Sequence, residues 1–147
     1  MPAALRPATV RRDPIRPAAS APAVVHGAGV APATLRVAVI AGCLLAAGLA
    51  LWVGDPTSSL QADPSLGRLL RCMALIKGCL VLGAVGAVWW RAGWPLPKPV
   101  AAGYAAGTWV LTGSTMLIWQ LSYIPLAAVL FHAAALGMLV VGWRERG

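Results

Sequence analysis

The sequence predicts an all-α membrane protein, in which four transmembrane helices pack as an antiparallel bundle and follow a disordered N-terminal tail. Three observations lead to this fold class. Of the 147 residues, 59% are hydrophobic and only 11% are charged, whereas soluble domains are nearer half apolar and a quarter charged. Four long apolar stretches follow one another along the chain, separated by segments of turn residues. The residues before the first stretch are instead rich in Ala, Pro and Arg.

The N-terminal segment, residues 1–34, is predicted to be a disordered basic tail in the cytoplasm. It holds six of the twelve prolines. Repeated Pro removes backbone donors and fixes φ, which disfavours a continuous helix. Because the segment lacks aromatic residues and a periodic apolar pattern, it buries too little surface to offset its ordering entropy. Its arginines are expected to contact anionic lipid; they are Arg6, Arg11, Arg12 and Arg16.

Each apolar stretch approaches or reaches the roughly 20 residues that a helix needs to cross about 30 Å of hydrocarbon. The second stretch is the weakest, because Arg71 and Lys77 interrupt it, but the long Lys77 side chain can extend toward the nearer surface. The predicted spans are residues 35–53, 69–90, 100–119 and 124–143.

The connecting segments agree with these spans. Residues 54–67 contain turn residues and two of the four acidic residues, and residues 91–99 contain three prolines. A helix interior would not tolerate those prolines. Only residues 120–123 separate the last two spans, so these spans are expected to be antiparallel neighbours. Pro125 then falls in the first turn of the last helix, where its missing N–H has no cost.

The charges predict the orientation. With a cytoplasmic N-terminus, nine of the twelve Lys and Arg residues lie inside, Arg68 and Arg71 lie outside, and Lys77 lies within the membrane. Basic residues near the membrane mark the cytoplasmic side. Tryptophans at the ends of the spans agree, since they favour the interfaces. Both termini are therefore predicted to be cytoplasmic. The interfacial tryptophans are Trp52 and Trp119 outside, and Trp89, Trp90 and Trp143 inside.

Composition also indicates the location. The excess of Arg over Lys, with abundant Ala and Gly, is typical of a GC-rich bacterial coding sequence. We therefore expect the bacterial inner membrane, with the mitochondrial inner membrane as the alternative. The net charge of +8 comes with few polar residues, which argues against a nucleic-acid partner. The apolar composition excludes a soluble enzyme and a disulfide scaffold.

Chemically reactive residues are sparse in the predicted spans. None of the spans contains Asp or Glu, which argues against carboxylate proton relays and cation-coupled transport. The three cysteines form no CxxC motif and have no neighbouring His in the sequence, so no metal site is predicted. We expect no catalytic residue, no metal and no cofactor, and hence not an enzyme.

One group of polar residues within the membrane stands out. Lys77 and His132 each lie about eight residues, or about 12 Å, below the outer ends of their spans. Thr112 and Thr115 are predicted to join the same layer. A cation at this depth needs carbonyls, water or an anionic partner. The candidates are a phospholipid head group, a haem propionate, a quinone carbonyl or the carboxylate of another subunit. In the simpler interpretation, Lys77 extends to the surface and His132 bonds a hydroxyl on the third span.

Small residues recur at helix-packing distances in all four spans. Small residues let helix backbones approach closely and gain van der Waals contact, which is the main packing force in lipid. We predict helix packing at Gly42, Gly83, Gly103, Gly107 and Gly137.

The function predicted from the sequence is that of a non-catalytic accessory, assembly or interaction subunit of a larger membrane complex. Its partner is expected to be another membrane protein or a second copy of the chain. One alternative is a small oligomeric transporter or channel. A second alternative is a haem- or quinone-binding membrane anchor that uses His132, although a bis-His haem site would need a second His from another chain.

Overall fold

The structure is a computed structural model of the chain, and it describes residues 29–55 and 63–146. Within these ranges an isolated bridge joins Val30 and Leu96, no strand is formed, and the regular structure is helical. The predicted all-α fold is therefore confirmed. Up to residue 28, the predicted tail lies outside the described residues. The helices are α1 (Pro32–Val53), α3 (Pro64–Arg91), α4 (Lys98–Trp119) and α5 (Ile124–Arg144).

The largest difference from the predicted boundaries is at the start of α3, which was expected at residue 69. The helix begins at Pro64 because Asp63 caps it: the carboxylate accepts the backbone N–H of Ser65 at 2.9 Å. Helix α1 begins at Pro32, inside the segment predicted to be disordered. In both helices Pro occupies the first turn, where its fixed φ is compatible with a helix. Pro32 is one of the prolines that were expected to disfavour a continuous helix in the N-terminal segment.

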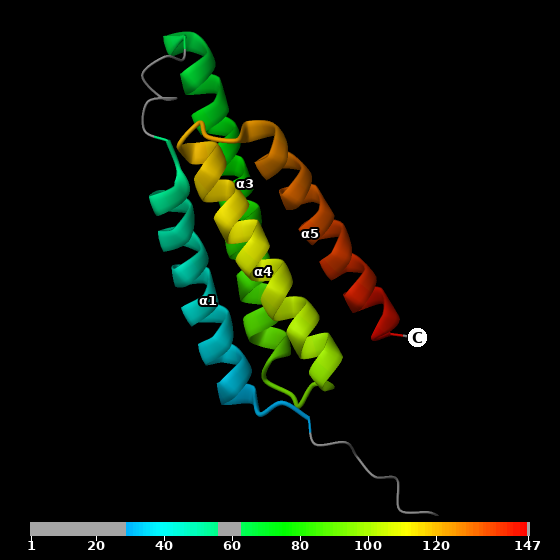
Figure 1. The fold of residues 1–147 in the computed structure, drawn as a ribbon. Coiled ribbons are helices and arrows are strands. Elements are labelled where there is room, and N and C mark those ends of the chain that lie inside the picture. Colours follow the sequence, from blue (N-terminus) through cyan, green and yellow to red (C-terminus); the bar gives the residue numbers. More distant parts are fainter. Residues whose placement is uncertain (1–28, 56–62, 147) are drawn as a thin grey trace, which may run out of the picture.

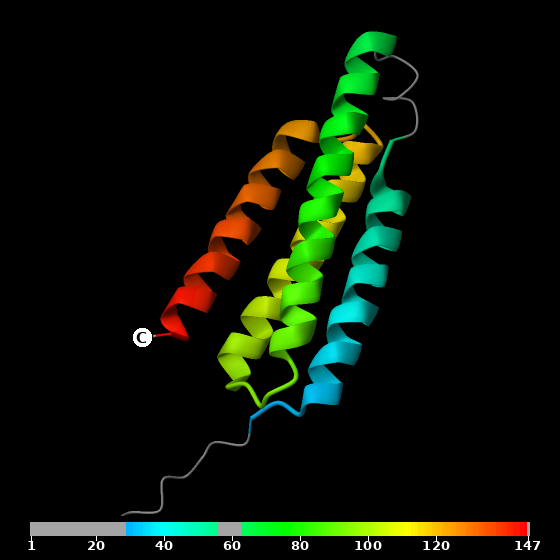
Figure 2. The ribbon, with the colours of Figure 1, turned by 180° about the vertical axis from the view of Figure 1, so that it is seen from behind.

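Helix α4 lies in the middle of the bundle and packs against each of the other three helices (Figures 1 and 2). In Figure 1, α1 and α5 lie on either side of α4, and α3 passes behind it. Helix α4 also carries more buried residues than any other described helix. These residues are Ala101, Tyr104, Ala105, Thr108, Leu111, Ser114 and Ile118.

Hydrogen bonds tie the beginning and the end of α1 to the connections on either side of α4. At one end, which we call the Leu96 end, the N–H of Val30 donates to the carbonyl of Leu96 at 3.0 Å. At the other end, the Ser122 end, the N–H of Asp55 donates to the hydroxyl of Ser122 at 3.0 Å. Helices α1 and α4 therefore begin at the Leu96 end and finish at the Ser122 end.

Helices α1, α3 and α5 are long and apolar enough to cross a membrane. At most 17% of the most apolar stretch of each is buried inside the protein, so large Leu and Val side chains cover the surface. Exposed apolar surface of this extent is unfavourable in water and suits lipid. Helix α4 is not among these three, because its Gly, Ser and Thr residues make it less apolar. It lies in the middle of the bundle, so many of its side chains contact the other helices.

Candidate functional site

Lys77 of α3 and His132 of α5 both lie beside the ring of Phe131. The Nζ of Lys77 stands over the Phe131 ring, 4.3 Å from its centroid. The imidazole of His132 meets the same ring nearly edge-on, with 5.7 Å between the centroids. The three side chains, which we call the basic row, therefore bridge α3 and α5. Phe131 is buried, Lys77 is half-buried and His132 is exposed.

The environment of Lys77 is apolar. A cation over an aromatic face gains about 0.5–2 kcal/mol, more when it is desolvated. An ammonium group has three N–H donors, and the face of Phe131 does not replace an anion. In the part of the chain that the structure describes, the salt bridge joins Arg91 and Glu145 at the Leu96 end, away from Lys77. The Lys77 ammonium therefore contacts the ring of Phe131, and no carboxylate of residues 29–55 or 63–146 forms a salt bridge with it.

His132 uses one ring nitrogen within its own helix. Its Nδ1 lies 2.7 Å from the carbonyl oxygen of Ala128, one turn earlier. Because a carbonyl oxygen accepts and does not donate, Nδ1 carries the proton in this contact. The predicted bond from His132 to a hydroxyl of the third span is therefore not formed. The exposed imidazole keeps Nε2 for a group outside the bundle.

The structure does not bring the two predicted threonines to the basic row. Thr112 donates its hydroxyl to the carbonyl of Thr108 at 2.8 Å and lies 3.4 Å from the Sγ of Cys43 on α1. Thr115 donates to the carbonyl of Leu111 at 2.8 Å. Threonine hydroxyls in helices commonly bond to the carbonyl one turn earlier. The hydroxyls of both residues are therefore engaged away from Lys77 and His132.

Three of the five predicted packing glycines lie at close helix contacts. A Cβ on Gly42 would stand 2.0 Å from the Trp109 ring, and on Gly107 it would stand 2.4 Å from Met138. At Gly103 it would meet Val141 at 3.1 Å. These contacts join α4 to α1 and to α5.

At the other two predicted packing glycines, Gly83 and Gly137, a Cβ would meet nothing within 4 Å. Neither glycine therefore lies at a close contact between the described helices of this chain. The spacing of small residues shows where a second helix can approach, but not whether one is present.

Sequence reasoning missed a polar contact that joins three helices at the Leu96 end. Arg91, the last residue of α3, donates to Glu145, which follows α5. Tyr104 of α4 donates its hydroxyl to the other carboxylate oxygen at 2.9 Å. The three residues lie far apart in the sequence. The sequence contains one indication of this contact: Glu145 is the one acidic residue that follows Asp63, and basic residues are therefore the natural partners for it.

Another basic side chain at the Leu96 end packs on a tryptophan ring. The guanidinium of Arg36 lies over the Trp89 ring, 4.9 Å from its centroid. Its buried Nε has no hydrogen-bond partner among the described residues. The stem of the side chain can pack on apolar groups while the charge reaches the membrane surface.

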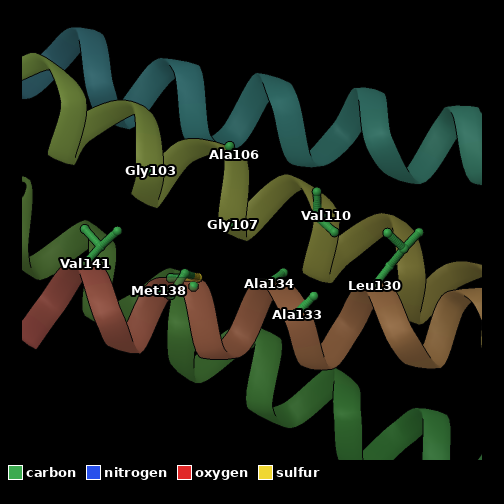
Figure 3. A pocket seen from close by; sticks show the side chains of 10 residues that line it. Gly103, Ala106, Gly107, Val110, Leu130, Ala133, Ala134, Met138 and Val141 are labelled. Carbon is green, nitrogen blue, oxygen red and sulfur yellow. The ribbon is translucent and has the colours of Figure 1, made fainter.

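An apolar groove of about 350 Å³ lies between α4 and α5 (Figure 3). Small residues of both helices leave this space open, and Val141 and Leu130 lie toward its two ends. None of the four predicted contact residues lines it. Its lining carries almost no polar surface, which suits a lipid chain better than a charged ligand. The lining residues are Gly103, Ala106, Gly107, Val110, Leu130, Ala133, Ala134, Gly137, Met138 and Val141.

Within residues 29–55 and 63–146, no three His, Cys, Asp or Glu side chains are grouped so that they could hold a metal ion. The candidate site is thus the basic row, a cation and an imidazole around a buried ring. Comparison of the chain with protein-family models, curated proteins and solved structures finds no match.

Proposed function

We propose that this chain is a four-span inner-membrane protein that acts as a non-catalytic accessory or assembly subunit and binds another membrane protein through the basic row. One observation carries this proposal. Lys77 and His132 lie near the middle of α3 and α5, and they meet around Phe131 at the surface of the bundle. Polar groups at this depth are costly in lipid and commonly mark a functional contact.

The position of α4 supports its assignment as the fourth span. It has 22 residues, or about 33 Å at 1.5 Å per residue, which matches the hydrocarbon thickness. The apolar helices α1, α3 and α5 all pack against it. The connection between α3 and α4 lies at the Leu96 end, and the connection between α4 and α5 lies at the Ser122 end (Figure 1). We infer an antiparallel up-and-down arrangement in which both termini lie on the same side.

The aromatic and basic residues support the orientation. Trp52, at the Ser122 end, is 84% exposed, and Trp90 and Trp143, at the Leu96 end, are 75% and 79% exposed. Tryptophans at two levels are typical of the interfaces of a membrane. The ends of the helices at the Leu96 end carry most of the described basic residues, which favours the cytoplasm for this end. They are Arg36, Arg91, Lys98, Arg144 and Arg146.

The arrangement of α4 favours a binding subunit over a channel or transporter. A polar pathway would need side chains that line an open route. The hydroxyls of α4 instead donate to carbonyls of their own helix, and Thr108 and Ser114 are buried. The donors are Thr108, Thr112, Ser114 and Thr115.

Two experiments test the proposal. Reporter domains fused after Gly147 and inserted within residues 56–62 should report opposite sides of the membrane, with the C-terminus inside. A photo-crosslinking amino acid is then placed at exposed Leu136, one turn after His132, and at exposed Leu45 on α1 as the matched control. Light should produce a discrete protein adduct at Leu136 and not at Leu45. Equal labelling at both positions, or none at Leu136, would contradict a partner at the basic row.

A further inference from the structure

We propose that the occupant of the basic row is a transmembrane helix of a different protein, which carries one Asp or Glu side chain at the depth of Lys77. This inference rests on the proposed function and identifies the chemistry of the partner. The carboxylate would pair with the ammonium of Lys77, near the exposed imidazole of His132. The ring of Phe131 is near both groups: it lies 4.3 Å from the Nζ of Lys77 and 5.7 Å from the centre of the His132 ring.

Charge complementarity is the first argument. Lys77 is a cation over an aromatic ring, and no described carboxylate pairs with it. In the interior of a membrane, ionisable side chains pair with one another or with backbone carbonyls. A carboxylate matches the ammonium in charge and supplies the acceptor oxygens that a phenyl ring lacks.

The depth of Lys77 in the membrane favours a carboxylate on a transmembrane helix, and not a lipid head group, as the anion that pairs with it. Gly67 of α3 lies level with the connection between α4 and α5, since a Cβ on it would stand 3.7 Å from Leu121. Lys77 is about ten residues farther along the helix, or about 15 Å from that level. This distance is about half of a 30 Å hydrocarbon layer. The phosphates of lipids lie outside this layer, whereas a carboxylate on a transmembrane helix can lie within it.

The distribution of acidic residues indicates a different protein and not a second copy. The chain has four acidic residues, and none lies within residues 64–144 or 32–53. Asp55 and Asp63 flank the helices at the Ser122 end, and Glu145 is already paired with Arg91 at the Leu96 end. The described helices of a second copy would therefore bring no carboxylate to the depth of Lys77.

The surface around the basic row fits an apolar helix with one polar residue. Large apolar side chains close to Lys77 and His132 in the sequence are exposed: Ile76 and Leu80 on α3, and Val129 and Leu136 on α5. Helices α3 and α5, which carry these residues, are seen from behind in Figure 2. A helix rich in Leu and Ala would pack on these residues, and its one carboxylate would meet Lys77.

The test uses the full chain in phosphatidylcholine vesicles together with a synthetic transmembrane peptide. The peptide is a Leu/Ala helix with one Glu at its centre, so that either orientation places the carboxylate near the level of Lys77. A peptide with Gln at the same position is the control. Energy transfer from a fluorescent protein fused after Gly147 to a labelled peptide measures association. We expect about tenfold tighter association with the Glu peptide than with the Gln peptide.

Variants then assign this preference to one residue. Lys77→Met should abolish the preference for the Glu peptide, Lys77→Arg should retain it, and Lys98→Met, which removes a Lys at the Leu96 end, should leave it unchanged. Circular dichroism checks that each variant is folded. A carbodiimide, which joins an amine to a carboxylate, should link the Glu peptide to Lys77.

Three results would overturn the inference. The first is equal association of the Glu and Gln peptides, and the second is a preference for the Glu peptide that persists in Lys77→Met. The third is an effect of Lys77 on the binding of phosphatidylglycerol added to the vesicles and not on that of the peptide, which would make the row a lipid site. If the light-induced adduct at Leu136 persists in any of these cases, the proposed function stands and this inference fails. If that adduct is absent, the proposed function itself fails.

Discussion

Trp109 of α4 lies directly against Gly42 of α1, where a Cβ would stand 2.0 Å from the indole ring. The same indole donates its Nε1–H to the carbonyl oxygen of Ala38, one turn earlier on α1, at 3.1 Å. A helix carbonyl has a second lone pair that can accept such a bond. One tryptophan therefore holds α1 against α4 by both packing and hydrogen bonding, and it requires glycine at position 42.

Gly42→Ala should consequently destabilise the bundle. The added methyl group meets a rigid ring, so one helix must move, and overpacking of this kind costs about 1–3 kcal/mol. The free energy of unfolding in detergent micelles, followed during a denaturant titration, measures the loss. Gly48→Ala on the same helix is the matched control, because a Cβ there meets nothing within 4 Å. The cost of Gly42→Ala should disappear in a Trp109→Ala background; an unchanged cost would show that the ring is not its cause.

Glu145→Gln should loosen the Leu96 end of the bundle. The substitution removes the negative charge that Arg91 pairs with and that Tyr104 bonds to. Because the Arg91 side chain is 37% exposed, water screens the pair, and we expect a loss of about 0.5–1 kcal/mol. Hydrogen exchange of the last turn of α5 should accelerate, while exchange in α1 should not change. Arg146→Gln is the control; an equal effect from this variant would assign the loss to net charge and not to the contact.

The start of α3 should depend on pH through Asp63. Hydrogen bonds from the backbone N–H and the hydroxyl of Ser65 hold the pKa of the Asp63 carboxyl below its ordinary value of 3.8. A lowered pKa in the folded state means that the stabilisation is present above pH 3.8 and is lost as the pH falls through the lower, folded value. Amide exchange near Gly67 should therefore accelerate below pH 3.8. Asp63→Asn, which caps without a charge, should remove this acid dependence; its persistence would exclude Asp63 as the source.

Tyr123→Asn should stabilise the connection between α4 and α5. Tyr123 has a φ of 51° and a ψ of 36° at the N-cap of α5, a left-handed conformation that costs a non-glycine residue roughly 1–2 kcal/mol. Asn tolerates this conformation and is a favoured N-cap, so we expect a gain of about 0.5–1 kcal/mol. Thermal unfolding in micelles measures the gain. Tyr123→Phe keeps the ring and the strain and should have no effect; a gain there would argue against backbone strain.

The depth of the candidate site could be predicted from the sequence, but its composition could not. Counting residues along two apolar spans placed Lys77 and His132 at the same level, and the structure brings both to one ring. The ring itself, Phe131, was not predicted, because an apolar residue in an apolar span gives no signal. Thr112 has the right depth, but it faces Cys43 on α1. Depth follows from residue count, whereas the direction of a side chain depends on how each helix is rotated.

The four helices and their approximate boundaries could be predicted from the sequence, because a long apolar stretch and the turn residues around it are local properties of the chain. The tertiary structure decided which helix lies in the middle. Helix α4 takes this place because its glycines and small residues let α1 and α5 approach closely, as at Gly107. At Gly83 of α3, by contrast, an added Cβ would meet no atom within 4 Å. Which small residues are used depends on the packing of all the helices together, and no single stretch of sequence contains that information.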